Sequence, residues 1–544
     1  GLGDQGACEN IVTVIQRLNA STVIVCGTHA GHPKCWFLGR NSSDLAKDQH
    51  GYVIVQEGDE IAPKLATQRV TTIAVDGNLY SALSSDAAKG SIGRSYGKKK
   101  HVKTEDKWLK NPTFVGSALI QGSDSNKAEL YFFFSESTET RLDEPPFTSH
   151  VGHVCKTDEG GPKNLLQHSW TTFLRARLVC GFTKESRYFN KLEDTFVVGG
   201  EAGAKDGTLF GIFTNLWNAT AICAYSVADI DKAFRESKLK GYTSAIPSNR
   251  PGACVSPGTP MISLKNTLNI IKDYPAIEQH IYPRDNSHPL YGNRQSYYTR
   301  LVADRVKAAS GEVYNVLFVG TGNGRIHKVL HDDGKSFIIS ELRPFPGEES
   351  VSALTLDTLT GHLYVGSSVS VARMPLADCS LYGESCRACV AARDPYCGWD
   401  RPSSTCAPVP PWMNSSDFLQ SVEQLNISIC ESLTEDEDVS TKTQELTVER
   451  GSNVYLPCLV KSYHATYTWS CDGGGSFSCS IKDGSCPLVF GAELSVSEGL
   501  FTCTARENGL AEELAVYRVT LGSAAERPYV TPALLCLTAL RALT

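Results

Sequence analysis

The sequence has no surplus of positive charge and no apolar run long enough to cross a membrane. Its 52 Lys and Arg residues are outnumbered by 59 Asp and Glu residues, giving a net charge of −7. This balance argues against nucleic acid as a partner and gives no reason to expect binding to a membrane surface. The apolar segment 530–544 is too short to span a bilayer core of about 30 Å. The opening Gly1–Asp4 also lacks the basic and apolar regions of a signal peptide, so we expect a processed chain or a fragment.

A recognisable pair of catalytic carboxylates is also lacking, because the sequence places no two of them as an acid/base couple. The glycines of 320–324 follow a strand, but no helix follows them, so they predict a hairpin turn and not a phosphate loop. We expect no enzymatic activity and no cofactor. A propeller glycoside hydrolase stays open as an alternative, because that fold does host catalysis.

Cysteine is abundant, with nineteen residues spread along the chain in close pairs. Five Asn-x-Ser/Thr sequons accompany them, at Asn19, Asn41, Asn218, Asn414 and Asn426. This combination indicates secretion into an oxidising compartment and an extracellular or cell-surface glycoprotein. A chain of 544 residues is too long for one ordinary core, so two to four domains are expected.

One group of residues has the spacing of a metal site. Cys26, His29, His32 and Cys35 could provide two thiolates and two imidazoles for a tetrahedral zinc ion. In a cysteine-dense secreted chain a disulfide between the two cysteines is the favoured reading.

Residues 1–378 read as all-β, with Val, Ile, Thr and Tyr runs broken by Gly, Asp and Asn. Segments 70–82 and 351–366 share one pattern: an apolar strand ending in Asp, a turn, and a strand containing Leu-Tyr. Segment 315–329 repeats the second half of this pattern, with a strand, a glycine turn and an alternating strand. Recurring short hairpins of this kind are typical of β-propeller blades. Two helices, beginning near Ser226 and Ser263, are predicted to decorate the propeller.

Three further segments follow. Residues 379–431 hold six cysteines around the octapeptide Arg393–Asp400 and are too few to build a large apolar core, so disulfides should staple this module. Residues 432–440 form an acidic linker. Residues 441–521 have the Cys458, Trp469 and Cys503 spacing of an immunoglobulin-like sandwich.

The octapeptide Arg-Asp-Pro-Tyr-Cys-Gly-Trp-Asp resembles the signature of the small cysteine-rich (PSI) module of plexins, semaphorins and integrins, in its semaphorin form. Segments 169–180, 26–35 and 250–254 resemble further semaphorin signatures. With these parts in order, the chain resembles a semaphorin: a seven-bladed sema propeller, which we expect to lack its first strands here, a PSI module, an immunoglobulin-like domain and a tail. The immunoglobulin segment and the tail are most similar to class seven. Small residues at 522–525, a short polar spacer and the apolar run of 530–544 resemble a GPI-anchor signal.

The resemblance implies a set of disulfides and three leftover cysteines. The implied pairs are Cys26–Cys35, Cys155–Cys254, Cys180–Cys223, Cys379–Cys397, Cys386–Cys430, Cys389–Cys406, Cys458–Cys503 and Cys479–Cys486. Cys8, Cys471 and Cys536 are expected to be unpaired within this chain, and the family partner of Cys8 would lie upstream of Gly1.

The resemblance also implies partners. A semaphorin would bind a plexin receptor, of the plexin-C type if class seven holds, and would act as a homodimer. For the receptor surface we single out Lys184, Arg187, Tyr188 and Phe189, because an aromatic residue beside basic residues suits an interaction hot spot. Their alternative role is packing.

Class seven can carry an integrin-binding Arg-Gly-Asp where this chain has Lys156, Thr157 and Asp158, and the departure puts integrin binding in doubt. A plexin-like receptor fragment, which would share the propeller and the PSI module, is a further alternative.

Overall fold

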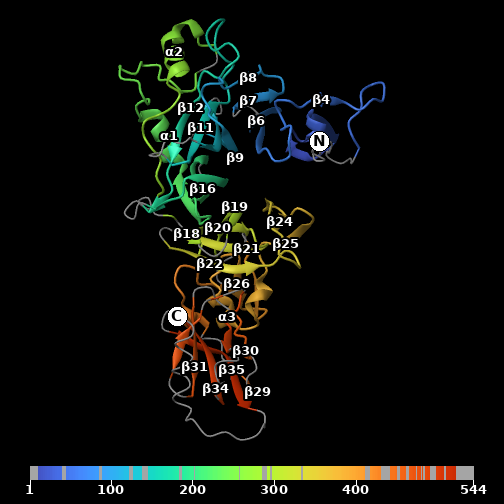
Figure 1. Ribbon diagram of the computed structural model, residues 1–544, viewed down its shortest axis with the longest axis vertical. Helices are drawn as coiled ribbons and strands as arrows, with labels where there is room; N and C mark the ends of the chain where they lie inside the picture. Colours follow the sequence, from blue (N-terminus) through green and yellow to red (C-terminus); the bar gives the residue numbers. More distant parts are fainter. Residues whose placement is uncertain are drawn as a thin grey trace.

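The computed structural model shows an elongated all-β molecule (Figure 1). Every helix in the described part of the chain is too short or too polar to cross a lipid bilayer. The structure describes residues 10–39, 44–84, 89–121, 127–137, 145–182, 187–200, 203–255, 258–284, 289, 291–293, 297–332, 335–410, 417–430, 442–449, 454–460, 465–472, 475–479, 481, 484–490, 498–507 and 510–521.

Six consecutive antiparallel sheets make up the propeller-like part, and in each of them the strand order follows the chain. This meander is the arrangement of a propeller blade. The first three sheets consist of β1 (Val12–Arg17), β2 (Thr22–Gly27), β3 (Lys34–Gly39) and β4 (Val55–Glu57); β5 (Val70–Val75), β6 (Asn78–Ser84), β7 (Gly90–Tyr96) and β8 (Val102–Lys103); and β9 (Pro112–Ile120), β10 (Glu129–Ser137), β11 (Phe147–Cys155) and β12 (Leu174–Leu178).

The fourth to sixth sheets continue the pattern, and a two-stranded hairpin precedes them. The hairpin is β13 (Gly181–Phe182) and β14 (Arg187–Tyr188). The sheets are β15 (Lys191–Gly200), β16 (Gly203–Thr214), β17 (Thr220–Ser226) and β18 (Tyr291–Asn293); β19 (Tyr298–Lys307), β20 (Val313–Thr321), β21 (Ile326–Asp332) and β22 (Lys335–Leu342); and β23 (Ala353–Asp357), β24 (His362–Gly366) and β25 (Val371–Pro375).

The hairpins expected from the sequence repeats are present as β5–β6, β20–β21 and β23–β24. The first turns through Asp76 and Gly77, both at positive φ (50° and 72°), as a tight two-residue hairpin turn requires. Glycines 320–324 belong to the β20–β21 hairpin, as predicted.

Two helices decorate the propeller, and each has a local cause. Helix α1 (Val227–Glu236) is capped by Ser226, whose hydroxyl accepts a hydrogen bond from the Asp229 amide at 3.2 Å. The second helical segment comprises η5 (Met261–Leu264) and α2 (Lys265–Asp273). It ends before Pro275, whose ring disfavours helical backbone in the residue before it.

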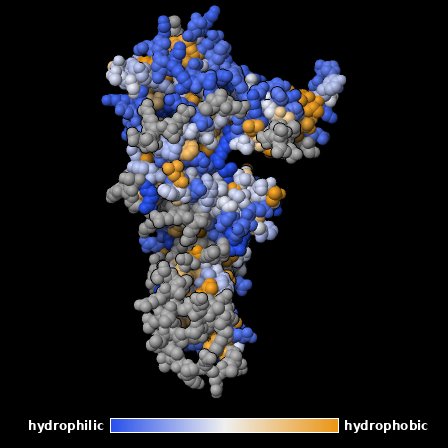
Figure 2. Space-filling view, in the orientation of Figure 1, coloured by the Kyte–Doolittle hydropathy of each residue, from blue (hydrophilic) through white to orange (hydrophobic). Residues whose placement is uncertain are grey.

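The sheets do not close into a ring within the described residues. Figures 1 and 2 show the first sheet and the sheet β23–β25 on opposite sides of an open space. Apolar side chains are exposed on both: Val12 (51%) and Ile15 (70%) on β1, and Val371 (77%) on β25.

The PSI module packs below the propeller. It contains η6 (Cys379–Tyr382), α3 (Cys386–Ala391), β26 (Cys397–Asp400), β27 (Thr405–Pro408), β28 (Phe418–Leu419) and η8 (Ile427–Cys430). Trp399 is buried against Cys386, Cys389 and Cys430, so an indole covers the disulfides of a module too small for a larger core.

The last domain has two sheets around the Cys458–Cys503 disulfide and the fully buried Trp469. One sheet has the order β29 (Thr443–Val448), β35 (Leu510–Leu521), β34 (Gly499–Glu507), β31 (Thr466–Cys471) and β32 (Ser476–Ser478). The other pairs β30 (Val454–Leu456) with β33 (Leu488–Phe490).

The structure contains all eight of the expected disulfides. One expectation about cysteine is wrong, because Cys471 is also disulfide-bonded. It lies at the end of β31, partly buried against the core of the last domain. Cys8 and Cys536 lie outside the described residues.

Candidate functional site

The hairpin β13–β14 presents the residues singled out for receptor binding. It follows Cys180, which the disulfide to Cys223 ties to β17. Gly181 pairs with Tyr188 and Phe182 with Arg187. The Arg187 guanidinium lies 5.5 Å from the centre of the Phe182 ring, and the Tyr188 side chain is 39% exposed. Arg187 and Tyr188 are therefore available at the surface, as a receptor contact requires.

The other two candidates differ in their outcome. Phe189 is only 4% exposed, and its amide donates to the Cys180 carbonyl at 2.9 Å. Its side chain packs in the largest core cluster. The prediction that Phe189 contacts the receptor is therefore wrong, and Phe189 has its alternative role as a packing residue. Lys184 lies outside the described residues.

A second hairpin turn lies at the same edge of the fourth sheet, and it was not among the residues predicted from the sequence. Lys191, three residues after Tyr188, pairs with Thr214 at the end of β16. The β16–β17 turn begins at the next residue and exposes Leu216 (72%) and Trp217 (88%). We call Arg187, Tyr188, Leu216 and Trp217 the fourth-sheet edge. Exposed aromatic and apolar side chains beside a cation are typical of interaction surfaces. The Leu-Trp pair next to a sequon was the signal available in the sequence.

The Lys156–Thr157–Asp158 loop is built for structure. The Asp158 side chain is buried and accepts five hydrogen bonds at 2.7–2.9 Å, from the amide and hydroxyl of Thr171, the amide and hydroxyl of Thr172, and the Gly160 amide. Lys156 pairs with Asp76 at 3.1 Å. An integrin ligand needs an exposed carboxylate. The Asp158 carboxylate is buried, so this loop does not offer an integrin the group that it would bind. The two threonines belong to the 169–180 motif, so this buried carboxylate connects the loop to that motif.

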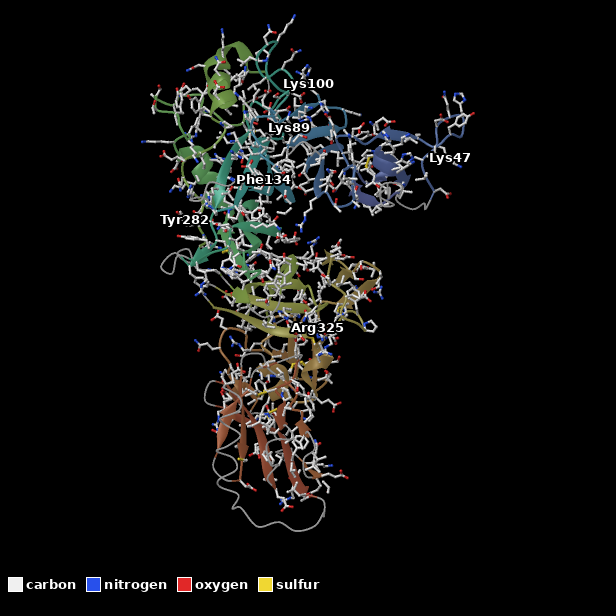
Figure 3. All side chains as sticks on the ribbon, in the orientation of Figure 1. Lys47, Lys89, Lys100, Phe134, Tyr282 and Arg325 are labelled. Atoms are coloured by element: carbon white, nitrogen blue, oxygen red, sulfur yellow. A yellow bond between two sulfur atoms is a disulfide. The ribbon has the colours of Figure 1, made fainter. Side chains whose placement is uncertain are left out.

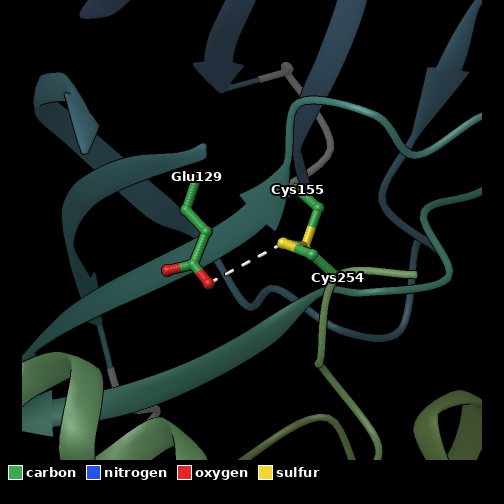
Figure 4. Close-up of side chains that lie close together, drawn as sticks. All are labelled: Glu129, Cys155 and Cys254. Carbon is green, nitrogen blue, oxygen red and sulfur yellow. Dashed lines mark hydrogen bonds between the residues drawn. A yellow bond between two sulfur atoms is a disulfide. The ribbon is translucent and has the colours of Figure 1, made fainter. Parts of the chain in front are cut away.

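Two groups with metal-like composition are occupied by disulfides. Cys26 and Cys35 are bonded to each other, which removes both thiolates from the considered zinc set. Glu129 lies 3.7 Å from Cys254, whose sulfur is bonded to Cys155 (Figure 4). Only one carboxylate then remains as a ligand, fewer than a metal site needs.

A cavity of about 370 Å³ opens between β9, β10 and β15. It is lined by Ser117, Ala118, Leu119, Phe133, Thr195, Phe196, Val197 and Gly199. This lining includes no carboxylate, whereas glycoside hydrolysis uses two. The cavity therefore gives the hydrolase alternative no support.

The junction between propeller and PSI module holds a buried charge network. Lys328 of β21 pairs with Asp394 at 2.5 Å, and its ammonium also donates to the Leu376 carbonyl at 2.9 Å. The Tyr382 hydroxyl donates to the same carboxylate at 2.7 Å. Burial lowers the pKa of Lys328, against the pull of Asp394 in the opposite direction. Burial also raises the pKa of Tyr382 well above its usual value.

The octapeptide makes further bonds across the junction. The Tyr396 hydroxyl donates to Asp304 of β19 at 2.6 Å, and the Lys328 ammonium lies 4.3 Å from the centre of its ring. Arg393 lies over the Phe337 ring of β22 at 4.2 Å. Its guanidinium also reaches Glu507 of the last domain at 3.8 Å. The octapeptide thus contacts all three domains and fixes the PSI module to the propeller.

Three of the five sequon asparagines are described, and all three are exposed: Asn19, Asn218 and Asn426. Asn41 and Asn414 lie outside the described residues.

Comparison with known proteins gives two domain matches. Residues 192–358 match the Sema domain model, and residues 378–430 match the plexin repeat (PSI) model. Semaphorin-7A of Mus musculus is 31% identical over 523 residues, covering 94% of this chain and 76% of the relative. Among solved structures, Drosophila Semaphorin 2a has a TM-score of 0.70 at 27% identity, covering 95% of this chain and 87% of that one. A chain from the structure titled "Drosophila Plexin A in complex with Semaphorin 1b" has a TM-score of 0.61 at 26% identity, covering 79% and 86%.

Proposed function

This chain belongs to the semaphorin family, and on that premise we propose that it is an extracellular signalling ligand that binds a plexin. The identity to Semaphorin-7A over 94% of the chain carries the proposal. The likeness to a chain from a plexin–semaphorin complex supports it. Because the identity runs to a semaphorin through all three domains, it favours the ligand over the plexin-like receptor fragment.

The finer assignment follows from the similarity to Semaphorin-7A. A class seven ligand would bind a plexin of the C type, act in cell or axon guidance and in immune-cell regulation, and sit at the cell surface through a GPI anchor. We propose that it acts as a homodimer. A dimer brings two receptors together, and the second binding event becomes intramolecular, which raises the apparent affinity without new contacts.

Arg187 and Tyr188 of the fourth-sheet edge are the proposed receptor contacts. The Tyr188 ring offers apolar area and a hydroxyl on a short, tied-down hairpin, so little conformational freedom is lost on binding. The charge of Arg187 favours an acidic patch on the receptor. The last domain, which we propose is immunoglobulin-like, would orient the dimer through the PSI module.

A binding assay tests this proposal. The whole chain, secreted from mammalian cells, is titrated against a panel of plexin ectodomains that includes a C-type receptor. We expect saturable binding to one member and at least a tenfold weaker Kd for Tyr188→Ala and for Arg187→Glu. Tyr52→Ala and Arg373→Glu are the matched controls, because both side chains are exposed away from the fourth sheet, Tyr52 in the connection between β3 and β4 and Arg373 on β25. A chain that bound no plexin at micromolar concentration, yet hydrolysed a glycoside, would overturn the proposal.

A further inference from the structure

Trp217 stands out among the tryptophans that the structure describes. Its side chain is 88% exposed, whereas Trp108, Trp170, Trp399 and Trp469 are buried. Leu216 beside it is 72% exposed. Together the two side chains leave a contiguous apolar surface in water, and such surfaces are typical of sites that another group covers.

The turn that carries Trp217 is held in one conformation. The Asn215 side-chain oxygen accepts hydrogen bonds from the Trp217 amide at 2.9 Å and the Ala219 amide at 3.0 Å. The Asn215 carbonyl accepts from the Asn218 amide at 3.2 Å, and the Asn215 amide donates to the Ala219 carbonyl at 3.1 Å. The indole therefore stays at the surface because the backbone has no freedom to turn it inward.

The next residue is a glycosylation acceptor. Asn218 begins the sequon Asn218-Ala219-Thr220, is exposed, and adopts a positive φ of 55° at the end of the turn. A sugar attached there is tethered beside the indole, so its local concentration is high without any further binding energy. Sugar rings present C–H groups on their faces, and the electron-rich face of an indole attracts such positively polarised groups.

We propose that an N-linked glycan on Asn218 packs over the indole of Trp217 and covers this end of the β16–β17 hairpin. The glycan is a better occupant than a protein partner, because any partner reaching Trp217 would meet the sugar on the adjacent residue. The cover would also confine the receptor surface to the Arg187 and Tyr188 side of the fourth-sheet edge. That consequence rests on the proposed function, whereas the contact itself does not.

The test measures the solvent accessibility of Trp217 by hydroxyl-radical labelling and peptide mass spectrometry. The whole chain is expressed with high-mannose glycans. Asn218→Gly removes the acceptor and keeps the turn, since glycine adopts a positive φ without strain. We expect labelling of residue 217 to rise several-fold in Asn218→Gly. Asn19→Gln is the matched control: it removes a glycan from an exposed turn whose neighbour Leu18 is buried, and should leave residue 217 unchanged.

Enzymatic trimming locates the contact. An endoglycosidase that leaves one sugar should keep labelling low if the first ring covers the indole, whereas complete removal should raise it. An unglycosylated Asn218 in the secreted protein, or labelling that is equal with and without the glycan, would overturn the inference. Trp217→Ala should also lower the melting temperature of the glycosylated protein and leave that of the fully deglycosylated protein unchanged. These readouts need no receptor, so failure of this inference and failure of plexin binding are separate results.

Discussion

The ammonium of Lys328 and the carboxylate of Asp394 lie 2.5 Å apart across the propeller–PSI junction, and both side chains are almost completely buried. Lys328 is on a propeller strand, and Asp394 is the second residue of the octapeptide. A pair of charges removed from water is stable only when further groups satisfy the remaining hydrogen-bonding capacity of both charges. The Leu376 carbonyl and the Tyr382 hydroxyl supply those partners here. The junction is therefore a fixed connection between the two domains.

Removing either charge alone should loosen this connection. In Lys328→Met the Asp394 carboxylate stays buried without its cation, which costs about 3–5 kcal/mol. We expect that loss in denaturant unfolding, and a broader distribution of molecular dimensions in small-angle scattering. Lys328→Met combined with Asp394→Asn should be less destabilised than Lys328→Met, because no unpaired charge remains.

Lys89→Met is the control for the junction. Lys89 pairs with Asp106 at 3.2 Å, but both side chains are more than half exposed, and Lys89 lies at the surface of the propeller (Figure 3). An exposed pair contributes little, so stability should change by less than about 1 kcal/mol. Equal losses at Lys89 and Lys328 would contradict the fixed-junction interpretation.

The sequence predicts local features well and contacts between distant segments poorly. The octapeptide and further segments resemble family signatures, so the PSI module and, through that resemblance, the eight disulfides could be anticipated. The Ser226 cap also follows from residues three apart. The bond from Lys328 to Asp394 has no such pattern, because 66 residues separate its ends and either residue would pass for a surface charge.

Single residues fail for the same reason. In the sequence, Asp158 looks like an exposed aspartate in a loop. Only the fold brings Thr171 and Thr172 to its carboxylate. Phe189 follows an exposed Arg-Tyr pair, but it turns inward where the chain enters β15. Cys471 could not be paired by a family pattern that does not include it.

Asp158 should be a stability residue and have no part in adhesion. Asp158→Ala leaves buried donors of Thr171 and Thr172 without an acceptor, so we expect a loss of at least about 3 kcal/mol and reduced secretion. Lys156→Ala, which breaks an ion pair with the largely exposed carboxylate of Asp76, should be close to neutral. Thermal unfolding measures both effects. Cell adhesion through an integrin that Asp158→Ala abolished, with stability unchanged, would contradict this reading.

His153 should make the protein sensitive to acid. Burial lowers its pKa to about 3, with Asp231 opposing and Arg235 adding to the shift. Its ring packs on Phe234, and the Glu129 carboxylate is 3.8 Å away, too far for a hydrogen bond. Since the unfolded chain binds a proton near pH 6.5 and the folded protein does not, stability falls as the pH drops below about 6.5.

The cost at pH 5 is about 2 kcal/mol relative to neutral pH. His153→Leu removes the titrating group, so the stability difference between this variant and the wild type should shift by that amount between pH 7.5 and pH 5. Denaturant titrations at the two pH values measure it. His29→Leu, at an exposed position, serves as the control and should show no such shift. A pH-independent difference for His153→Leu would refute the prediction.

The open space between the first sheet and the sheet β23–β25 should promote self-association of the chain as it stands. Ile15 on β1 and Val371 on β25 are both at least 70% exposed. Among the described residues, β1 and β25 are edge strands of their sheets. Exposed apolar strands pair with other copies, whereas a lysine on such a strand prevents it. Ile15→Lys with Val371→Lys should therefore shift light-scattering profiles away from species larger than a dimer. Leu459→Lys, at a 73% exposed position in the last domain, should leave those profiles unchanged. If all variants gave the same profile, the exposed sheets would not be the surface that drives association.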